Sequence, residues 1–253
     1  MAGVPRSKDL RPLVLQNTCV KWITSIISLQ LGDIVAQITP PQQKGFIRGR
    51  YMYDHLYDAF GGWSDLKEGC FLFVDFSKAY DSVTHQFASS FLTALCLPPE
   101  LVSLLLNLFK SPMALIVNGG VCLSSLIWPK SGIRQGCSLS PILFAMLVSP
   151  IIGRLNSISP HILVLFYADD SLVIIRDSQS NCTPHLSNIN SALKEFEFIV
   201  GLSVNKDKSA ILLKGYWQEM HKAAASSTGY RIQSKYKYLG VLLGDILASE
   251  AFV

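Results

Sequence analysis

The sequence has few charged residues, and its cysteines form no ligand pattern. Charged side chains make up 16% of the 253 residues, against 49% hydrophobic ones. The six cysteines are scattered, with no C-x-x-C pair and no cysteine–histidine cluster, which argues against a zinc site. It favours reduced core cysteines in an intracellular protein. Repeats and low-complexity stretches are also missing, so the composition indicates a globular chain and excludes a disordered one.

Long apolar runs are missing too. The most apolar window, Pro141–Ile152, is short and has a proline at each of Pro141 and Pro150, so we expect a buried core segment. Residues 2–12 are polar and basic, and no secretory signal is expected there. A membrane protein is therefore the least favoured class. No basic cluster makes a convincing nuclear signal, which leaves both cytoplasm and nucleus open.

Charge is unevenly distributed along the chain. Basic residues gather in residues 1–50 and 201–253, and acidic residues gather in residues 51–100. This arrangement suits a polyanion-binding surface around an acidic, metal-binding centre. On charge alone, the simpler alternative is uneven surface charge without a function.

Periodicity and turn signals predict an α+β chain built on a small central sheet. Strands are expected where apolar runs are short and bounded by turn residues, and helices where the apolar spacing is helical. The expected helices cover residues 13–38, 51 onward, a segment ending near 96, 100–110, 141 onward and 184–200. The expected strands cover residues 69–76, a hairpin over 113–117 and 121–128, 203–205, 210–213 and 238–243.

The most informative stretch is His161–Ile175, HILVLFYADDSLVII, in which two adjacent aspartates interrupt an apolar run. The pattern predicts two buried strands joined by a tight acidic turn. Because ionised aspartate is rarely buried without a partner, we expect a positive group beside the turn, and a divalent metal ion is the natural candidate. The alternative is a hairpin whose tip is simply solvated.

A second acidic residue, Asp75, ends the apolar strand CFLFVDF. If that strand neighbours the hairpin, Asp75, Asp169 and Asp170 converge at one edge of the sheet. Carboxylates held together raise one another's pKa. Two Mg²⁺ ions would relieve this repulsion and would serve phosphoryl transfer.

The chain resembles reverse transcriptases, most closely those of non-LTR retrotransposons of the long interspersed element type. An isolated Y-x-D-D is weak support, but seven blocks stand in the family's order and cover nearly the whole chain. They are LRPL at 10–13, QKGFIRGR at 43–50, FVDFSKAYDSV at 73–83, GIRQGCSLSP at 132–141, FYADD at 166–170, GLSVNKDKS at 201–209 and YKYLGV at 236–241.

The resemblance implies a right-hand polymerase palm, which is a ferredoxin-like antiparallel sheet with packed helices. Residues 1–68 would form partial fingers, and residues 69–253 the palm with interleaved fingers segments. The thumb would be largely absent, because few residues follow Leu243. The implied activity is RNA-directed DNA polymerisation: nucleotidyl transfer from a dNTP to a DNA or RNA primer 3′ end on an RNA template. Two Mg²⁺ ions would be the cofactors, and Mn²⁺ can substitute at such oxygen-rich sites.

The resemblance also assigns the catalytic residues. Asp75 and Asp169 would hold the metal ions together with the main-chain carbonyl of Phe76. Asp170 would tune the site or serve as an auxiliary ligand. Lys208 matches the position that protonates the pyrophosphate leaving group, although a lysine in a polar turn is often only solvated.

Five residues match nucleotide-binding positions, and one of them is Phe76. Arg11 would grip the triphosphate, unless it is an ordinary surface arginine. Tyr80 would lie beneath the sugar and disfavour a ribose 2′-OH, unless it is a core residue. Gln135 and Gly136 would line the pocket, and Gly136 would allow a close approach of the backbone to the nucleotide.

Two further groups match nucleic-acid contacts. An aromatic ring among cations suits a single-stranded template, and a hairpin near the end of the chain would support the primer terminus. The template residues are Phe46, Arg48 and Arg50, and the primer residues are Tyr238, Leu239 and Gly240.

Two other functions stay open. The chain could be a reverse-transcriptase-like RNA-binding module without catalysis, as in maturase-type splicing factors, or a decayed fragment. The intact Asp75, Asp169 and Asp170 argue against the module, but a recently decayed copy would keep them. It could also be another palm enzyme, such as an RNA-dependent RNA polymerase or a nucleotide cyclase. Tyr80 favours deoxynucleotides over these alternatives.

Overall fold

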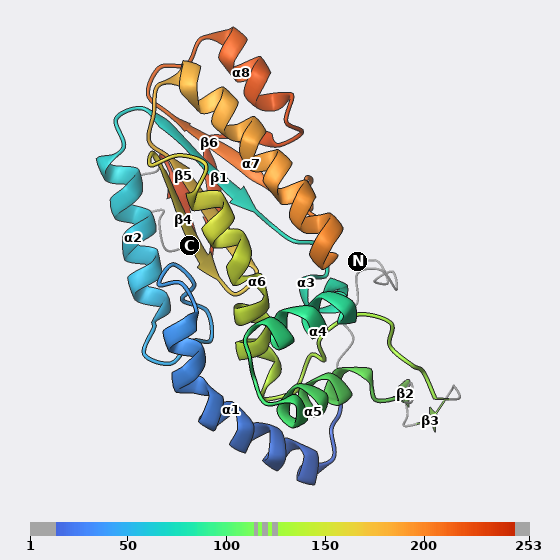
Figure 1. The fold of residues 1–253 in the computed structure, drawn as a ribbon. Helices are drawn as coiled ribbons and strands as arrows, with labels where there is room; N and C mark the ends of the chain where they lie inside the picture. Colours follow the sequence, from blue (N-terminus) through green and yellow to red (C-terminus); the bar gives the residue numbers. More distant parts are fainter. Residues whose placement is uncertain (1–13, 114–115, 118–120, 123–125, 246–253) are drawn as a thin grey trace.

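The computed structural model describes residues 14–113, 116–117, 121–122 and 126–245, and the expected triphosphate contact Arg11 lies outside them. Helices and strands are interspersed along the chain (Figure 1). The helices are α1 Thr18–Ile38, α2 Met52–Asp65, α3 Ala79–Ser82, α4 His85–Ala94, α5 Pro99–Lys110, α6 Ser140–Asn156, α7 Gln179–Val200 and α8 Glu219–Ser226. The strands are β1 Gly69–Val74, β2 Ile116–Val117, β3 Val121–Cys122, β4 Ile162–Tyr167, β5 Asp170–Ile175, β6 Ala210–Lys214, β7 Arg231–Gln233, β8 Lys235–Tyr238 and β9 Val241–Gly244.

A five-stranded sheet in the order β4-β5-β1-β6-β7 forms the centre of the fold. All six residues of β1 are buried, as expected for an apolar run that lies between two other strands. Every neighbouring pair is antiparallel except β6–β7, which is parallel. The expected antiparallel arrangement is found for β4, β5, β1 and β6, and the parallel β7 makes the whole sheet a mixed one. The α8 crossover places β7, a short strand with two exposed residues, beside β6 in this direction.

The two faces of β1 contribute to two separate cores, because successive side chains of a strand point to opposite sides. Cys70, Leu72 and Val74 belong to the larger core, which includes buried residues of α4, α5, α6 and α7. Phe71 and Phe73 belong to the smaller core with residues of α2, β8 and β9. Figure 1 shows α6 and α7 across one face of the sheet and α2 along its side.

Helices α6 and α1 test the expectation that the apolar segments lie in a protein core. The Pro141–Ile152 window lies within α6, in which most side chains are buried, so it is a core helix. Among the described helices, α1 is long and apolar enough to cross a bilayer by length and composition alone. Core helices of soluble proteins pass the same test, and α1 has both buried residues such as Val35 and exposed ones such as Trp22.

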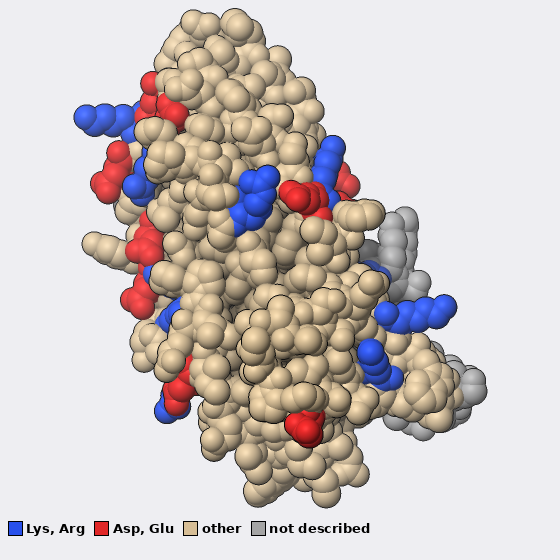
Figure 2. Space-filling model, viewed as in Figure 1, with Lys and Arg blue, Asp and Glu red and all other residues tan. Residues whose placement is uncertain are grey.

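Charged side chains are sparse on the face drawn in Figure 2, and lysine, arginine, aspartate and glutamate are intermixed there. Among the described residues on that face, they form no continuous basic strip. The uneven charge along the sequence therefore does not become a one-sided basic surface on this side of the molecule.

Several elements differ from the sequence prediction. The strand expected at 238–243 is a hairpin, β8–β9, in which Leu239 and Gly240 form the turn with φ of 48° and 86°. The helix expected to end near residue 96 is divided into α3 and α4. The strand expected at 203–205 is a single bridge between Val204 and Phe76. The turn of the β2–β3 hairpin lies outside the described residues.

Candidate active site

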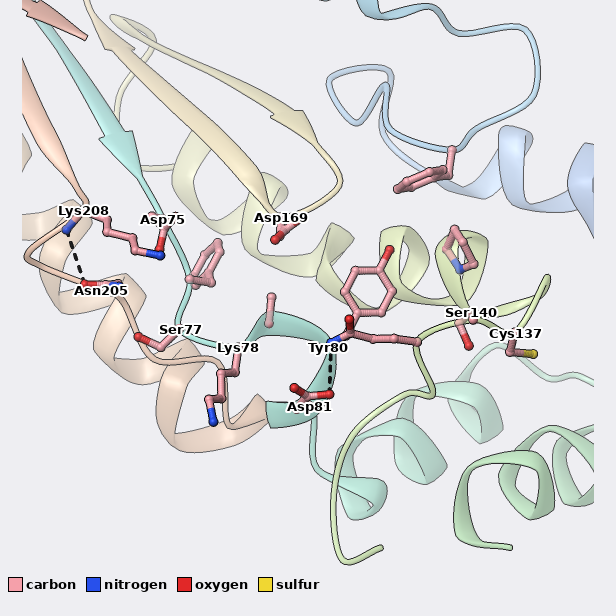
Figure 3. Close-up of a pocket in the computed structure, with 16 residues that line it drawn as sticks. Asp75, Ser77, Lys78, Tyr80, Asp81, Cys137, Ser140, Asp169, Asn205 and Lys208 are labelled. Carbon is pink, nitrogen blue, oxygen red and sulfur yellow. Dashed lines mark hydrogen bonds between the residues drawn. The ribbon is translucent and has the colours of Figure 1, made fainter. Parts of the chain in front are cut away.

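A pocket of about 700 Å³ lies at the end of β1 and beside the β4–β5 turn (Figure 3). Its wall is built from chain segments far apart in the sequence, and eight of the predicted site residues belong to it. The wall consists of Phe46, Asp75, Phe76, Ser77, Lys78, Ala79, Tyr80, Asp81, Gln135, Gly136, Cys137, Ser140, Pro141, Asp169, Asn205 and Lys208.

The backbone of Asp75 is fixed by the turn that precedes β6. The Asp75 N–H donates to Ser209 Oγ at 3.0 Å, and the Asp75 carbonyl accepts the Asn205 N–H at 2.8 Å. Ser209 Oγ in turn donates to the Asn205 carbonyl at 2.7 Å, and Ser209 is buried. Asp75 therefore leaves β1 in one defined direction. The sequence prediction missed Ser209 and Asn205, although both stand in the GLSVNKDKS block.

Asp169 lies on a two-residue hairpin turn. Tyr167 pairs with Asp170 in the β4–β5 ladder, so Ala168 and Asp169 form the turn, and Ala168 has a φ of 57°. Asp169 lines the pocket, and its side chain is shown in Figure 3. The sequence thus predicted the tight acidic turn correctly.

Asp170 lies on the other side of this strand end. It is exposed and close to Tyr236 and Tyr238. The pKa of each tyrosine hydroxyl is raised first by burial and then by nearby negative charge, to which Asp170 contributes in both cases. The three carboxylates therefore gather at one end of the sheet, where β1 ends and β5 begins, with Asp75 and Asp169 on the pocket wall and Asp170 beside the tyrosines.

The pocket donors suit a hard divalent cation. Among the described residues, no three His, Cys, Asp or Glu side chains are grouped so that they could hold a metal ion. Of the three aspartates that line the pocket, Asp75 and Asp169 are the predicted metal ligands, with Phe76 beside them. Carboxylate and carbonyl oxygens are the ligands that Mg²⁺ prefers. A site of this kind would leave several positions on the ion for water. Lys208 adds positive charge to the same wall and extends toward Asp75 in Figure 3.

Tyr80, on α3, presents its ring to the pocket. The ring stacks on Phe144 of α6 at 4.4 Å between centroids and 16° between planes. Burial raises the pKa of the Tyr80 hydroxyl, and the negative charge of Asp169 raises it further, so the hydroxyl stays protonated. The Tyr80 carbonyl accepts the Ile133 N–H at 2.6 Å, which ties α3 to the GIRQGCSLSP loop.

Gln135 and Gly136 line the pocket from that loop. Gln135 Nε2 donates to Asp81 Oδ1 at 3.2 Å, and the Gln135 carbonyl accepts the Val14 N–H at 3.0 Å. Gly136 has a φ of 99°, and a Cβ there would lie 2.8 Å from the Val14 carbonyl oxygen. We expected Gly136 to make room for a ligand; the close neighbour is the chain's own backbone.

The three predicted template residues have different surroundings. Phe46 lines the pocket and is 50% exposed, and Arg48 is exposed and pairs with Asp33 at 3.0 Å. The Arg50 guanidinium instead donates to four backbone carbonyls at 2.5–2.8 Å, those of Ala36, Thr39, Pro40 and Gln43. Burial lowers the Arg50 pKa. The template assignment of Arg50 is corrected, because its donors are directed into the end of α1 and the following loop.

The predicted primer residues lie on the β8–β9 hairpin, and one of them faces the core. Tyr238 is buried against Phe73 and shares a 2.7 Å hydrogen bond between its hydroxyl and His55 Nε2. The Tyr238 side chain therefore packs into the core, and the expected role of this hairpin in supporting the primer terminus stays a prediction. Leu239 is half-buried and Gly240 is exposed at the turn.

The His55–Tyr238 pair makes stability sensitive to acid. His55 is fully buried, and burial lowers its pKa from 6.5 to about 4. Between pH 6.5 and 4 the unfolded chain binds more protons at this histidine, so stability is lost as pH falls through that window. The expected loss is about 3 kcal/mol by pH 4. It can be measured by urea unfolding of the wild type and His55→Gln at pH 7 and 4.5; the variant should lose less stability. His161→Gln, at an exposed histidine, should behave like the wild type.

A reverse transcriptase (RNA-dependent DNA polymerase) family model matches residues 4–243. The chain is 27% identical, over 82% of its length, to an uncharacterized 149 kDa protein of transposon TX1 from Xenopus laevis. It is 25% identical, over 93% of its length, to the retrovirus-related Pol polyprotein of the type-2 retrotransposable element R2DM from Drosophila melanogaster. The chain spans 16% and 24% of these two proteins.

Solved structures share the fold. Telomerase from Candida tropicalis, truncated from its C-terminal domain, matches with a TM-score of 0.62 and 13% identity over 91% of this chain and 48% of that one. Telomerase from Candida albicans, in complex with a TWJ fragment of telomeric RNA, matches with a TM-score of 0.52 and 16% identity over 90% of this chain and 36% of that one. At these identities the likeness concerns the architecture, a mixed sheet with packed helices as in a polymerase palm.

Proposed function

The chain belongs to the reverse transcriptase family, and from this premise we propose that it adds deoxynucleotides to a primer 3′ end on an RNA template. The observation that carries the proposal is the presence of Asp75 and Asp169 on the wall of one pocket with Tyr80. Two carboxylates beside a pocket of about 700 Å³ suit a nucleoside triphosphate with its cation. In the same proposal, residues 1–68 are partial fingers, and residues 69–253 are palm with interleaved fingers segments.

Reverse transcriptases generally use divalent metal ions. In our proposal Asp75, Asp169 and the Phe76 carbonyl hold two Mg²⁺ ions, for which Mn²⁺ can substitute. Bound there, the ions would supply the charge neutralisation that phosphoryl transfer needs. Asp170 acts as an auxiliary group through its charge.

In this proposal the chain's own side chains orient the nucleotide, the template and the primer, and they disfavour ribonucleotides. Tyr80 limits the space beneath the sugar, Gln135 and Gly136 border the nucleotide, and Lys208 donates a proton to the leaving pyrophosphate. Phe46 stacks on a template base and Arg48 adds charge contact to its backbone. At the hairpin turn, Leu239 and Gly240 support the primer terminus, and Arg11 contacts the triphosphate.

The first experiment is incorporation of dTTP on poly(rA)/oligo(dT) with Mg²⁺, with UTP as the competing substrate. Extension with dTTP in preference to UTP is expected. A folded chain that binds the primer–template but extends nothing would favour the RNA-binding module, and a preference for UTP would favour another palm polymerase.

Tyr80→Ala is expected to weaken discrimination between dTTP and UTP roughly 10- to 100-fold, because the ring that restricts a 2′-OH is removed. Tyr80→Phe keeps the ring on Phe144 and should discriminate like the wild type. The ratio of kcat/KM for the two nucleotides measures the effect. Equal ratios in all three proteins would show that the ring does not act on the sugar.

A further inference from the structure

The loop after α1 runs along the β4 end of the catalytic hairpin. The Phe166 N–H donates to the Gln42 carbonyl at 3.0 Å, and the Lys44 N–H donates to the Phe166 carbonyl at 2.8 Å. Gln43 lies between these two bonds, and its side chain is fully buried. Because a buried carboxamide is costly unless its donors and acceptors are used, its partners matter.

Both backbone polar groups of Ala168 bond to the Gln43 side chain. The Ala168 N–H donates to Gln43 Oε1 at 2.9 Å, and Gln43 Nε2 donates to the Ala168 carbonyl at 3.3 Å. Oε1 also accepts the Gly45 N–H at 2.9 Å. Ala168 has a φ of 57°, which is unfavourable for alanine, and it directly precedes Asp169.

The glutamine is itself fixed from behind. The Arg50 guanidinium donates to the Gln43 carbonyl at 2.7 Å and to three other carbonyls of the α1 end. A continuous series of hydrogen bonds therefore runs from Arg50 through Gln43 to Ala168. These contacts resist displacement of the turn on which Asp169 lies.

We propose that Gln43 is a positioning residue: its carboxamide holds the Ala168–Asp169 turn in its left-handed conformation and so places the Asp169 carboxylate on the pocket wall. The expected effect of Gln43 on catalysis rests on the proposed function. The restraint that Gln43 places on the turn does not depend on that function.

The test compares Gln43→Met, which keeps the length of the side chain but loses its hydrogen bonds, with Gln42→Met as a matched control. Gln42 is half-buried and contributes its backbone carbonyl to the same hairpin. Three quantities are measured: amide hydrogen exchange of the peptide covering residues 166–171, Mn²⁺ binding by electron paramagnetic resonance, and steady-state dTTP incorporation.

Gln43→Met is expected to speed exchange at the turn and to weaken Mn²⁺ binding roughly tenfold, since a loosened supporting shell misplaces the ligand. The kcat should fall roughly 10- to 100-fold, with a smaller change in the KM for primer–template. Gln42→Met should match the wild type in all three. Unchanged exchange and unchanged Mn²⁺ binding in a folded Gln43→Met would overturn the inference.

Gln43→Glu provides a test by rescue. A protonated carboxyl can accept from the Ala168 N–H and donate to its carbonyl, as the amide does, whereas the carboxylate loses the donor. Exchange at the turn is expressed as the ratio of the Gln43→Glu rate to the wild-type rate at the same pH, which cancels the intrinsic rise of amide exchange with pH. This ratio should be nearest to one at low pH and should increase with pH; a ratio that does not change with pH would also count against the inference. If the wild type incorporates nothing while exchange responds as expected, the proposed function fails and the restraint stands.

Discussion

Asp169→Ala is expected to lower the rate of templated dTTP incorporation by at least roughly a thousandfold, to background. The physical reason is that Asp75 would be left as the one carboxylate of the proposed pair on the pocket wall. Asp169 lies at a partly exposed turn, so its loss should change the free energy of unfolding little. Single-turnover extension of a labelled primer measures the effect, and thermal unfolding confirms that the variant is folded.

The matched control is Asp207→Ala. Asp207 stands in the turn that braces Asp75, but its side chain is 86% exposed and pairs with Arg231 at the surface. An exposed ion pair of this kind contributes little to the free energy of unfolding, so Asp207→Ala should be folded and should extend primers like the wild type. If Asp169→Ala kept the wild-type rate, the assignment of the pocket as a nucleotidyl-transfer site would be wrong.

Gly45→Ala should destabilise the chain by about 3–5 kcal/mol, the second large effect we expect. A Cβ on Gly45 would lie 2.1 Å from the Ala168 nitrogen and 2.8 Å from the Tyr167 carbonyl carbon, and both are backbone atoms. The loop and the hairpin must therefore move apart, and this movement breaks the hydrogen bonds between Gln43 and Ala168. Urea unfolding measures the loss, and incorporation should fall with it.

Gly61→Ala is the control for this prediction. Gly61 lies inside α2, and a Cβ there would meet nothing within 4 Å. Alanine in a helix is favoured over glycine by about 1 kcal/mol, so this variant should be slightly more stable than the wild type. Similar stabilities for the two variants would contradict the contact between Gly45 and the turn.

The central elements were predictable because their signals are local. CFLFVDF is a continuous apolar run and became β1, and the aspartate turn followed from apolar runs on both sides of it. β7 and α8 were missed, since they are short and carry polar or small residues whose structure depends on the neighbouring β6. The expectation of one strand at 238–243 failed because its centre is the turn at Leu239 and Gly240.

The sequence predicted which residues lie near the site better than it predicted where their side chains point. The motifs brought Asp75, Asp169 and Tyr80 to one pocket. They could not show that Arg50 and Tyr238 point inward, because tertiary packing decides which donors find carbonyls and which rings fill the core. Gln43 was overlooked for the same reason: a glutamine before a lysine and a glycine looks solvated until its buried partner is known.

The hydrogen bonds around the site join residues far apart in the sequence, and this has a consequence for folding during synthesis on the ribosome. Gln43 meets Ala168 across 125 residues, Asp75 meets Ser209 across 134, and His55 meets Tyr238 across 183. Contacts of such sequence separation form slowly, after most of the chain is available. Until β5 and β6 emerge, both edges of the apolar strand β1 stay unpaired, which is the condition that promotes aggregation. We therefore expect β1 to be prone to aggregation in the nascent chain until β5 and β6 have been synthesised.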